Sequence, residues 1–412
     1  MINGERLWRN IHELAAISEE DKPWTRRSFT AKYNEGRKWL VKQMEEIGLE
    51  VQIDEAANVT GKRSGTNPEL PPIVIGSHTD TVPDGGRFDG IAGVLAGLEV
   101  LRTLKEQDIQ LPYTILLTDF TAEEPSEYGL STVGSRAWAG NLTSDMLQYK
   151  NAEDKSLSEA IAFAGGDPEN IAMCRKAKQA VALYLELHIE QGPVLLHHHA
   201  QLGVVTGIVG IQRYKITVDG QPNHAGTTPM NMRMDALTAA SEIVLALEKE
   251  AKKKYDNQVV GTIGTINNYP NASNVVPGKV EMAVEIRSVS DPVIDQLGSN
   301  FKKEVASISE KRKITIAVDD ISRSKPIVVK EKVRDLLTKA CEDVADNIVA
   351  LPSGAGHDAN QMSLLGPAGM LFIPCKDGRS HCPEEWAEKE DVCLGAEAML
   401  RAVLHFCEME AT

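Results

Sequence analysis

Residues 76–90 read GSHTDTVPDGGRFDG and bring His78, Asp80 and Asp89 together directly after the apolar run at 73–75. An imidazole and carboxylates that emerge from a buried strand are typical of a metal site. Asp80 is placed to orient the ring of His78 from behind. Asp89 follows a glycine-rich turn, and its carboxylate is suited to bridging two ions. The segment therefore predicts a metal site.

Two further segments offer side chains of the same chemistry. A strand predicted at residues 114–119 runs into the adjacent acids Glu123 and Glu124, which suit a general base and a metal ligand. A strand predicted at residues 182–189 delivers His188 at its end. The sequence thus places histidines and carboxylates at the ends of several strands.

The elements that must position these residues alternate between helices and short β-branched strands. Periodicity predicts helices at 35–47 and 91–106, and strands at 51–54, 73–77 and 114–119. This order indicates an α/β domain with ligands at the strand ends, where open sheets place their sites.

From residue 211 the pattern changes to β-α-β-β-α-β, the order of a ferredoxin-like α+β unit. Strands are predicted at 214–218, 259–266, 279–288 and 313–319, with helices at 234–253 and 291–310. After residue 325 the helix and strand alternation resumes and ends in a helix at 391–408. We therefore expect a catalytic domain in two parts, 1–210 and 326–412, with an inserted domain at 211–325.

Composition narrows the function. The formal net charge of -15 argues against nucleic acid as a partner. No stretch approaches the roughly 18 apolar residues of a membrane helix, and the N-terminus lacks the apolar core of a secretory signal. The 6 cysteines show no CxxC spacing, which favours reduced thiols and a cytoplasmic location.

The 10 histidines divide into two groups. His12 and His405 lie in predicted helices and favour a structural role, and the run at 197–199 favours a solvated helix end. The remaining histidines lie among Gly, Pro, Asp or Glu at probable strand ends or loops, and we expect function from these: His78, His188, His224, His357 and His381.

With these residues in view, the chain resembles the binuclear metal amidohydrolases of the M20 peptidase clan. It is most similar to the branch of N-carbamoyl-L-amino-acid hydrolases, β-ureidopropionases and allantoate amidohydrolases. Seven blocks in order carry the resemblance: GSHTDTVPDGGRFDG at 76–90, TAEEPSEYGLSTVGSR at 121–136, ELHIEQGPVL at 186–195, NHAGTTPMNMRMDAL at 223–237, NASNVVPG at 271–278, SGAGHDA at 353–359 and SHCPEE at 380–385.

The resemblance implies a mixed-sheet, zinc-peptidase-like catalytic domain with an inserted ferredoxin-like dimerisation or lid domain. It also implies two divalent ions per subunit, one held by His78 and His188 and the other by Glu124 and His381, with Asp89 bridging them. Histidine and carboxylate ligands suit zinc, manganese, cobalt or nickel, and the spacing does not rank these metals.

The resemblance further implies the catalytic roles. Glu123 is expected to be the general base, and Asp80 supports His78. His224 is expected to stabilise the oxyanion, often from the neighbouring subunit, so a homodimer is implied.

Substrate contacts are expected from the inserted domain. Arg287 is suited to grip a carboxylate, Asn274 to add an amide contact and Arg213 to make a second contact. Either arginine is open to a second interpretation as an ordinary surface charge. Gln191 and His357 are expected near the substrate without an assigned role. A carboxylate clamp distant from a metal-bound carbonyl describes a ureido acid.

Two departures bear on specificity. Residues 125–128 read PSEY where relatives commonly carry GSRF, so Glu127 introduces a negative charge. Cys382 follows His381 where relatives commonly carry serine, and packing is favoured over metal binding for this thiol. The leading hypothesis is hydrolysis of the ureido C–N bond of an N-carbamoyl-L-amino acid or of allantoate. The alternatives are a dimetal aminopeptidase or dipeptidase of the same clan and a non-catalytic metal-binding relative.

Overall fold

The computed structural model describes residues 1–255 and 259–409. The chain divides into two compact units, one formed by Met1–Thr206 with Val329–Thr412 and the other by Gly207–Val328. The insertion expected at residues 211–325 therefore falls inside the second unit. Its role as a dimerisation or lid domain stays a prediction.

A mixed nine-stranded sheet forms the centre of the first unit, and only its short edge strand β13 and the last two residues of β6 fall within the residue range of the second unit. β3 pairs in parallel with β4 and β5, and β15 pairs in parallel with β5, so these four strands end at the same edge. The order is β1-β2-β4-β3-β5-β15-β6-β13, and β14 pairs with β6. The bounds are β1 Glu50–Ile53, β2 Val59–Arg63, β3 Ile73–Ser77, β4 Ile115–Asp119, β5 Leu183–Ile189, β6 Leu202–Ile208, β13 Ile327–Val328, β14 Ile348–Ser353 and β15 Ala368–Ile373.

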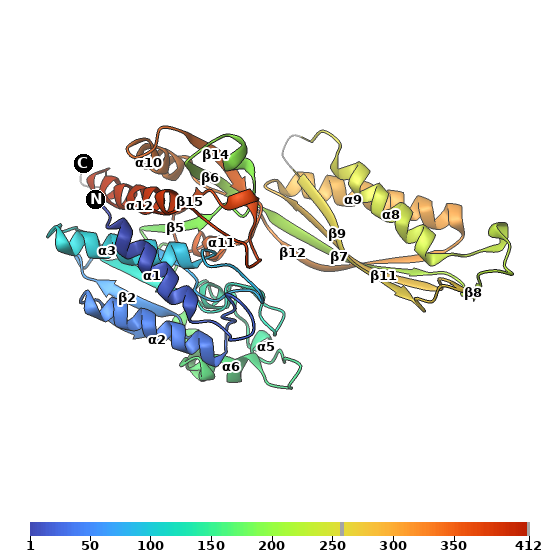
Figure 1. Cartoon of the computed structure of the whole chain (residues 1–412), viewed down its shortest axis with the longest axis horizontal. Helices are drawn as coiled ribbons and strands as arrows, with labels where there is room; N and C mark the ends of the chain where they lie inside the picture. The colour runs from blue at the N-terminus through green and yellow to red at the C-terminus, as the bar shows by residue number, and fades with distance from the viewer. Residues whose placement is uncertain (256–258, 410–412) are drawn as a thin grey trace. The chain divides into compact units, whose positions relative to one another are not determined.

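Helices pack against this sheet, and the helix that follows Asp89 is the most deeply buried. α3 (Ile91–Glu106) contacts β3 and β5 as well as α1 (Gly4–Ala16) and α12 (Lys389–Met409) (Figure 1). A Cβ on Gly93 would lie 2.2 Å from the carbonyl oxygen of Leu187, so glycine permits the close approach of α3 to β5. The remaining helices of this unit are α2 (Ala31–Glu46), α4 (Val133–Trp138), α5 (Ser144–Leu147), α6 (Leu157–Phe163), α7 (Val194–His197), α10 (Glu331–Glu342) and α11 (Asp358–Met362).

The second unit is a four-stranded antiparallel sheet of order β12-β7-β11-β9 with two helices on one face (Figure 1). Alternate apolar residues of β7 and β11 are buried against these helices, as the period of two requires. A small pair, β8 (Asn223–His224) and β10 (Val275–Val276), lies outside this sheet. The bounds are β7 Gly210–Asp219, α8 Ala236–Ala251, β9 Val259–Tyr269, β11 Lys279–Ser288, α9 Asp291–Arg312 and β12 Thr315–Ser324.

The α/β fold class and the ferredoxin-like strand order agree with the sequence prediction. β9 and β12 run further than expected, to Tyr269 and Ser324, because their polar ends stay paired with β11 and β7. None of the described helices is long and apolar enough to cross a membrane.

Candidate metal centre

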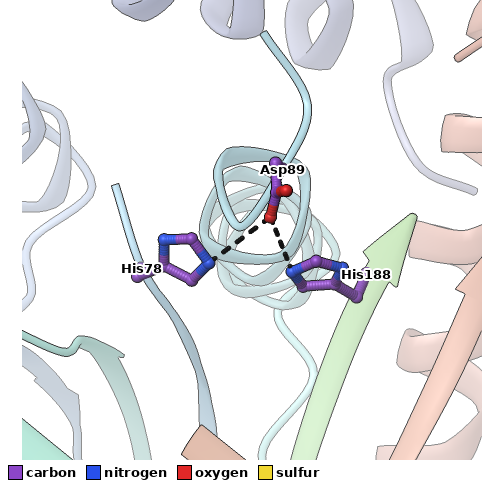
Figure 2. Close-up of side chains that lie close together, drawn as sticks. All are labelled: His78, Asp89 and His188. Atoms are coloured by element: carbon purple, nitrogen blue, oxygen red, sulfur yellow. Dashed lines mark ion pairs between the residues drawn. The ribbon is translucent and has the colours of Figure 1, made fainter. Parts of the chain in front are cut away.

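The carboxyl ends of β3 and β5 bring two imidazoles to one carboxylate. His78 follows β3 and His188 lies in β5, while Asp89 lies just before α3. Nε2 of His188 is 3.0 Å and Nε2 of His78 is 3.6 Å from Oδ1 of Asp89 (Figure 2). All three side chains are buried. These residues form a first cluster that offers ligand atoms to one ion.

The second oxygen of Asp89 faces a second cluster. Oδ2 of Asp89 lies 3.1 Å from Nε2 of His381, and Oε1 of Glu124 lies 3.2 Å from the same nitrogen. Asp89, Glu124 and His381 again offer ligand atoms within reach of one ion. Asp89 therefore presents one oxygen to each cluster, as a bridging carboxylate must.

The backbone fixes the direction in which the buried rings point. Nδ1 of His78 is 3.0 Å from the carbonyl oxygen of Asp80, and Nδ1 of His188 is 2.9 Å from that of Ile189. A proton on each Nδ1 leaves Nε2 with its lone pair directed at Asp89. In the described part of the chain, the buried Nε2 of His78 has no hydrogen-bond partner, which fits a nitrogen that binds a cation.

The charges of the site also fit bound cations. Within residues 1–255 and 259–409, Asp89, Glu123 and Glu124 form ion pairs only with histidines. Burial raises the pKa of Glu123 well above its usual value, and the charge of Glu124 raises it further. Burial alone would lower the pKa of His78, but the carboxylates of Glu123, Asp89 and Asp80 together raise it. Divalent ions would offset this concentration of negative charge.

Asp80 supports the site in a way that its sequence position did not reveal. Its backbone carbonyl, rather than its carboxylate, makes the hydrogen bond to His78, and Oδ1 lies 3.6 Å from Nδ1 of the ring. Its two carboxylate oxygens instead accept the backbone N–H groups of Glu123 and Glu124, each at 3.2 Å. The Asp80 carboxylate therefore holds in place the backbone of Glu123, the expected base, and of Glu124, the expected ligand.

Gln191 and His357 both contact expected ligands. Gln191 donates from Nε2 to Oδ2 of Asp89 at 2.7 Å. His357 is 2% exposed, and its ring centroid lies 4.6 Å from that of His188 in an edge-on contact. Nε2 of His357 shares a hydrogen bond of 2.8 Å with the hydroxyl of Ser353. Whether either residue touches a substrate stays a prediction.

Glu186 forms a further buried group with His188 and His357. Its carboxylate already accepts hydrogen bonds from the hydroxyls of Ser77 and Tyr184 and from the N–H of Ala359. Because these donors occupy both oxygens, the geometry favours a hydrogen-bonded support beneath the site over a further ion site.

The expected substrate arginines lie on the sheet of the second unit, where one acid holds both. Nε of Arg213 lies 2.6 Å from Oε2 of Glu285, and Arg287 lies 2.6 Å from Oε1 of the same carboxylate. Sequence reasoning missed Glu285. The two-residue spacing of Glu285 and Arg287 on a strand was the available signal, because it puts both side chains on one face.

His224 and Asn274 lie together at the other end of this sheet. His224 pairs with Val275 across β8 and β10, and the carbonyl of Asn274 accepts the N–H of Ala225. Nδ1 of His224 accepts the N–H of Gly226 at 3.1 Å, so the neutral ring carries its proton on Nε2. The exposed ring therefore offers a hydrogen-bond donor.

Within one chain, the expected substrate contacts Asn274 and Arg287 lie too far apart to meet on one small ligand. Arg287 lies opposite Ile211 at one end of the β7–β11 pair, and Lys279 lies opposite Asp219 at the other. The strand from Lys279 to Arg287 spans roughly 26 Å at about 3.3 Å per residue, and Asn274 lies beyond Lys279. A ligand the size of an amino acid cannot reach both side chains in the same chain.

The two departures from the family pattern have local partners. Glu127 forms an ion pair of 2.7 Å with Arg27, so its added negative charge is balanced. Cys382 is partly buried and belongs to none of the candidate metal clusters of the described residues. Ser380, which precedes His381, was missed by the sequence reasoning although it lies in the SHCPEE block. Its hydroxyl oxygen lies 2.7 Å from Oδ2 of Asp89, within hydrogen-bond distance.

Residues 74–405 match the model of peptidase family M20/M25/M40. The chain belongs to this family, and the resemblance drawn from the sequence blocks is confirmed. It is 37% identical over 411 residues to an N-carbamoyl-L-amino acid amidohydrolase of Geobacillus stearothermophilus, covering 100% of both chains. It is 30% identical to a ureidoglycolate hydrolase of Arabidopsis thaliana, covering 97% of this chain and 85% of that one.

The fold has a close counterpart among solved structures. An amidase of the hydantoinase/carbamoylase family from Burkholderia multivorans superposes with a TM-score of 0.91 at 34% identity and 98% coverage of each chain. The chain is thus a metal-dependent hydrolase with the M20 fold. The names of these relatives describe enzymes that hydrolyse C–N bonds other than peptide bonds.

Proposed function

We propose that the protein hydrolyses the carbamoyl C–N bond of an N-carbamoyl-L-amino acid or a related ureido acid such as allantoate. The products are the amine or amino acid, ammonia and carbon dioxide. The observation that carries this proposal is the bridging geometry of Asp89, with one oxygen toward His78 and His188 and the other toward His381. The names of the relatives direct it to ureido compounds.

Five residues would hold two divalent ions, of zinc, manganese, cobalt or nickel: His78, Asp89, Glu124, His188 and His381. When bound, such a pair activates a water molecule and polarises the substrate carbonyl. Nε2 of His78 is buried beside the carboxylates of Asp89 and Glu123 and makes no hydrogen bond within the described residues, which supports this assignment.

Glu123 would be the general base. Its Oε2 lies 3.6 Å from Nε2 of His78, beside the first cluster, and Asp80 fixes its backbone. From this position the carboxylate takes a proton from the attacking water and returns it to the leaving nitrogen.

The second unit would supply the substrate contacts. Arg287 and Arg213 face one side of its sheet, and Glu285 fixes their direction, so they are suited to a carboxylate. The Nε2–H of His224 is suited to an oxyanion. Because Arg287 and the pair of His224 and Asn274 lie far apart in one chain, one substrate would meet both only if a second copy contributes one set. This supports a homodimer.

The decisive experiment is an ammonia assay on ion-free protein that has been reloaded separately with zinc, manganese, cobalt or nickel. The substrates are allantoate, ureidopropionate and a panel of N-carbamoyl-L-amino acids, with dipeptides as the control. We expect ammonia from at least one ureido acid and no cleavage of the dipeptides. Cleavage of dipeptides without ammonia release from any ureido acid would assign the chain to the peptidases of the clan instead.

A further inference from the structure

Glu385 is a fully buried carboxylate that neither the ligand set nor the proposed base includes. It lies between the segment that carries His381 and helix α12. Its Oε1 accepts the backbone N–H groups of Phe88 at 2.8 Å and of Asp89 at 3.1 Å. Its Oε2 lies 2.8 Å from the hydroxyl oxygen of Ser380, whose single proton goes either to Glu385 or to Oδ2 of Asp89. One carboxylate thus holds the backbone of Asp89 and the residue that precedes His381.

The turn before Asp89 is shaped around this carboxylate. A Cβ placed on Gly86 would lie 1.9 Å from Cδ of Glu385, a contact that no side chain tolerates. The absence of a side chain at Gly86 therefore allows Glu385 to approach the backbone of Phe88 and Asp89.

A second contact ties the same two segments together. The guanidinium of Arg87 lies 4.6 Å from the ring centroids of both Trp24 and Trp386. Trp386 directly follows Glu385, so the segments 86–89 and 380–386 are joined by hydrogen bonds and by a cation–π contact. Such contacts limit the freedom of the Asp89 carboxylate before any ion binds.

From this geometry we infer that Glu385 is a positioning residue, which aligns Asp89 between the two metal clusters and couples it to the loop of His381. The inference rests on the proposed two-ion site. Glu385 acts through the backbone N–H of Asp89 and through Ser380, whose hydroxyl also reaches Oδ2 of Asp89. Loss of residues that orient a ligand typically weakens metal binding by about 10- to 100-fold.

The test measures the dissociation constant of the ions by competition with a chelator, for wild type, Glu385→Ala, Glu385→Gln and the exposed neighbour control Glu384→Ala. We expect Glu385→Ala to raise the constant by about 10- to 100-fold. Glu385→Gln should stay close to wild type, because its amide oxygen still accepts both N–H groups and its NH2 donates to Ser380. Glu384→Ala should match wild type. The melting temperature of each ion-free protein reports any general loss of structure separately.

A double-mutant comparison keeps the inference testable if Glu385→Ala folds poorly. Gly86→Ala should weaken ion binding in the wild type and have a much smaller effect in Glu385→Gly, where the carboxylate that it would strike is absent. Ser380→Ala, which removes only the hydroxyl link, should weaken binding less than Glu385→Ala.

Three results would overturn the inference. Unchanged ion affinity in Glu385→Ala would show that Glu385 does not position Asp89, while the proposed site itself would stand. A Glu385→Gln variant as weak as Glu385→Ala would show that charge, rather than hydrogen bonding to the backbone, is what matters. A wild-type protein that binds no ion would overturn the site and the inference together.

Discussion

Arg213 and Glu285 face each other across strands β7 and β11, with Nε of the arginine 2.6 Å from the carboxylate. The same carboxylate holds Arg287, so both guanidinium groups have a fixed direction. We expect Arg287→Lys to raise KM for a ureido acid by about 10- to 100-fold, the equivalent of ~1.5–3 kcal/mol for a hydrogen bond to a charged group. The measurement is steady-state kinetics on the acid and on its uncharged carboxamide.

The carboxamide separates recognition from general damage, because the penalty of Arg287→Lys should disappear for a substrate without the acid group. Arg323→Lys is the matched control, since Arg323 pairs with Asp291 and Asp295 in the same unit. An equal penalty on the acid and the carboxamide would remove Arg287 from the carboxylate site.

Substitutions of the adjacent acids Glu123 and Glu124 should have different effects, one on turnover and the other on metal content. Glu123→Gln is expected to keep the metal content of the wild type and to lower kcat by roughly 100- to 10,000-fold, the contribution of a general base. Glu124→Gln is expected to lose one ion, because its carboxylate faces His381. Elemental analysis beside the ammonia assay checks both. Near-normal turnover in a metal-replete Glu123→Gln protein would mean that another group accepts the proton.

His224 should act in trans. His224→Ala and Glu123→Gln are each expected to be nearly inactive as pure proteins. Random mixing of their subunits should restore about one quarter of wild-type activity, since half of the dimers are mixed and each has one complete site. The measurement is activity after unfolding and refolding the mixture. A mixture no more active than its components would place His224 in the site of its own chain or outside any site.

Removal of the ions should destabilise the first unit. The carboxylates of Asp89, Glu123 and Glu124 have only histidines as charge partners in the described part of the chain, so they repel one another without cations. At a free ion concentration 100 times the dissociation constant, each site adds about 2.7 kcal/mol to the free energy of unfolding. Thermal melting with and without a chelator measures this difference. An unchanged melting temperature would argue against ion binding by the folded state.

A buried ion pair beneath the site should matter for stability. Nε of Arg37 lies 3.2 Å from Oδ2 of Asp119, with side chains 5% and 0% exposed. Arg37→Met should lower the free energy of unfolding by about 3–5 kcal/mol, because it leaves the carboxylate buried and unpaired. Denaturant unfolding measures the loss. Lys42→Met, at the exposed pair with Glu46, is the control and should change stability by less than about 0.5 kcal/mol.

The sequence predicted the best-patterned elements closely. β3 and α3 begin and end at the expected residues. A short apolar run ahead of Gly-Ser-His is typical of a buried strand, and a long helical period marks the bounds of the helix. β6 and β15 were not predicted as separate strands. Their apolar runs do not distinguish a buried strand from a helix, and their pairing depends on partners distant in sequence.

The metal ligands of the candidate site were predictable, because histidine and carboxylate side chains next to predicted elements are themselves the signal for metal binding. His78 follows strand β3, His188 lies near the end of β5 and Asp89 precedes helix α3, and the structure brings their side chains together. The support from Asp80, Ser380 and Glu385 was not predictable, because it consists of contacts to backbone N–H groups and hydroxyls that come together only in the folded chain.

The order of the ligands along the chain has a consequence for biosynthesis. His78, Asp89 and His188 all precede the inserted unit, whereas His381 and the Glu385 that supports Asp89 follow it. During synthesis, the residues of the first cluster leave the ribosome long before the residues that complete the second cluster. A nascent chain can therefore gather at most the first cluster, and under the proposed two-ion mechanism the protein gains activity only after its last segment has been made.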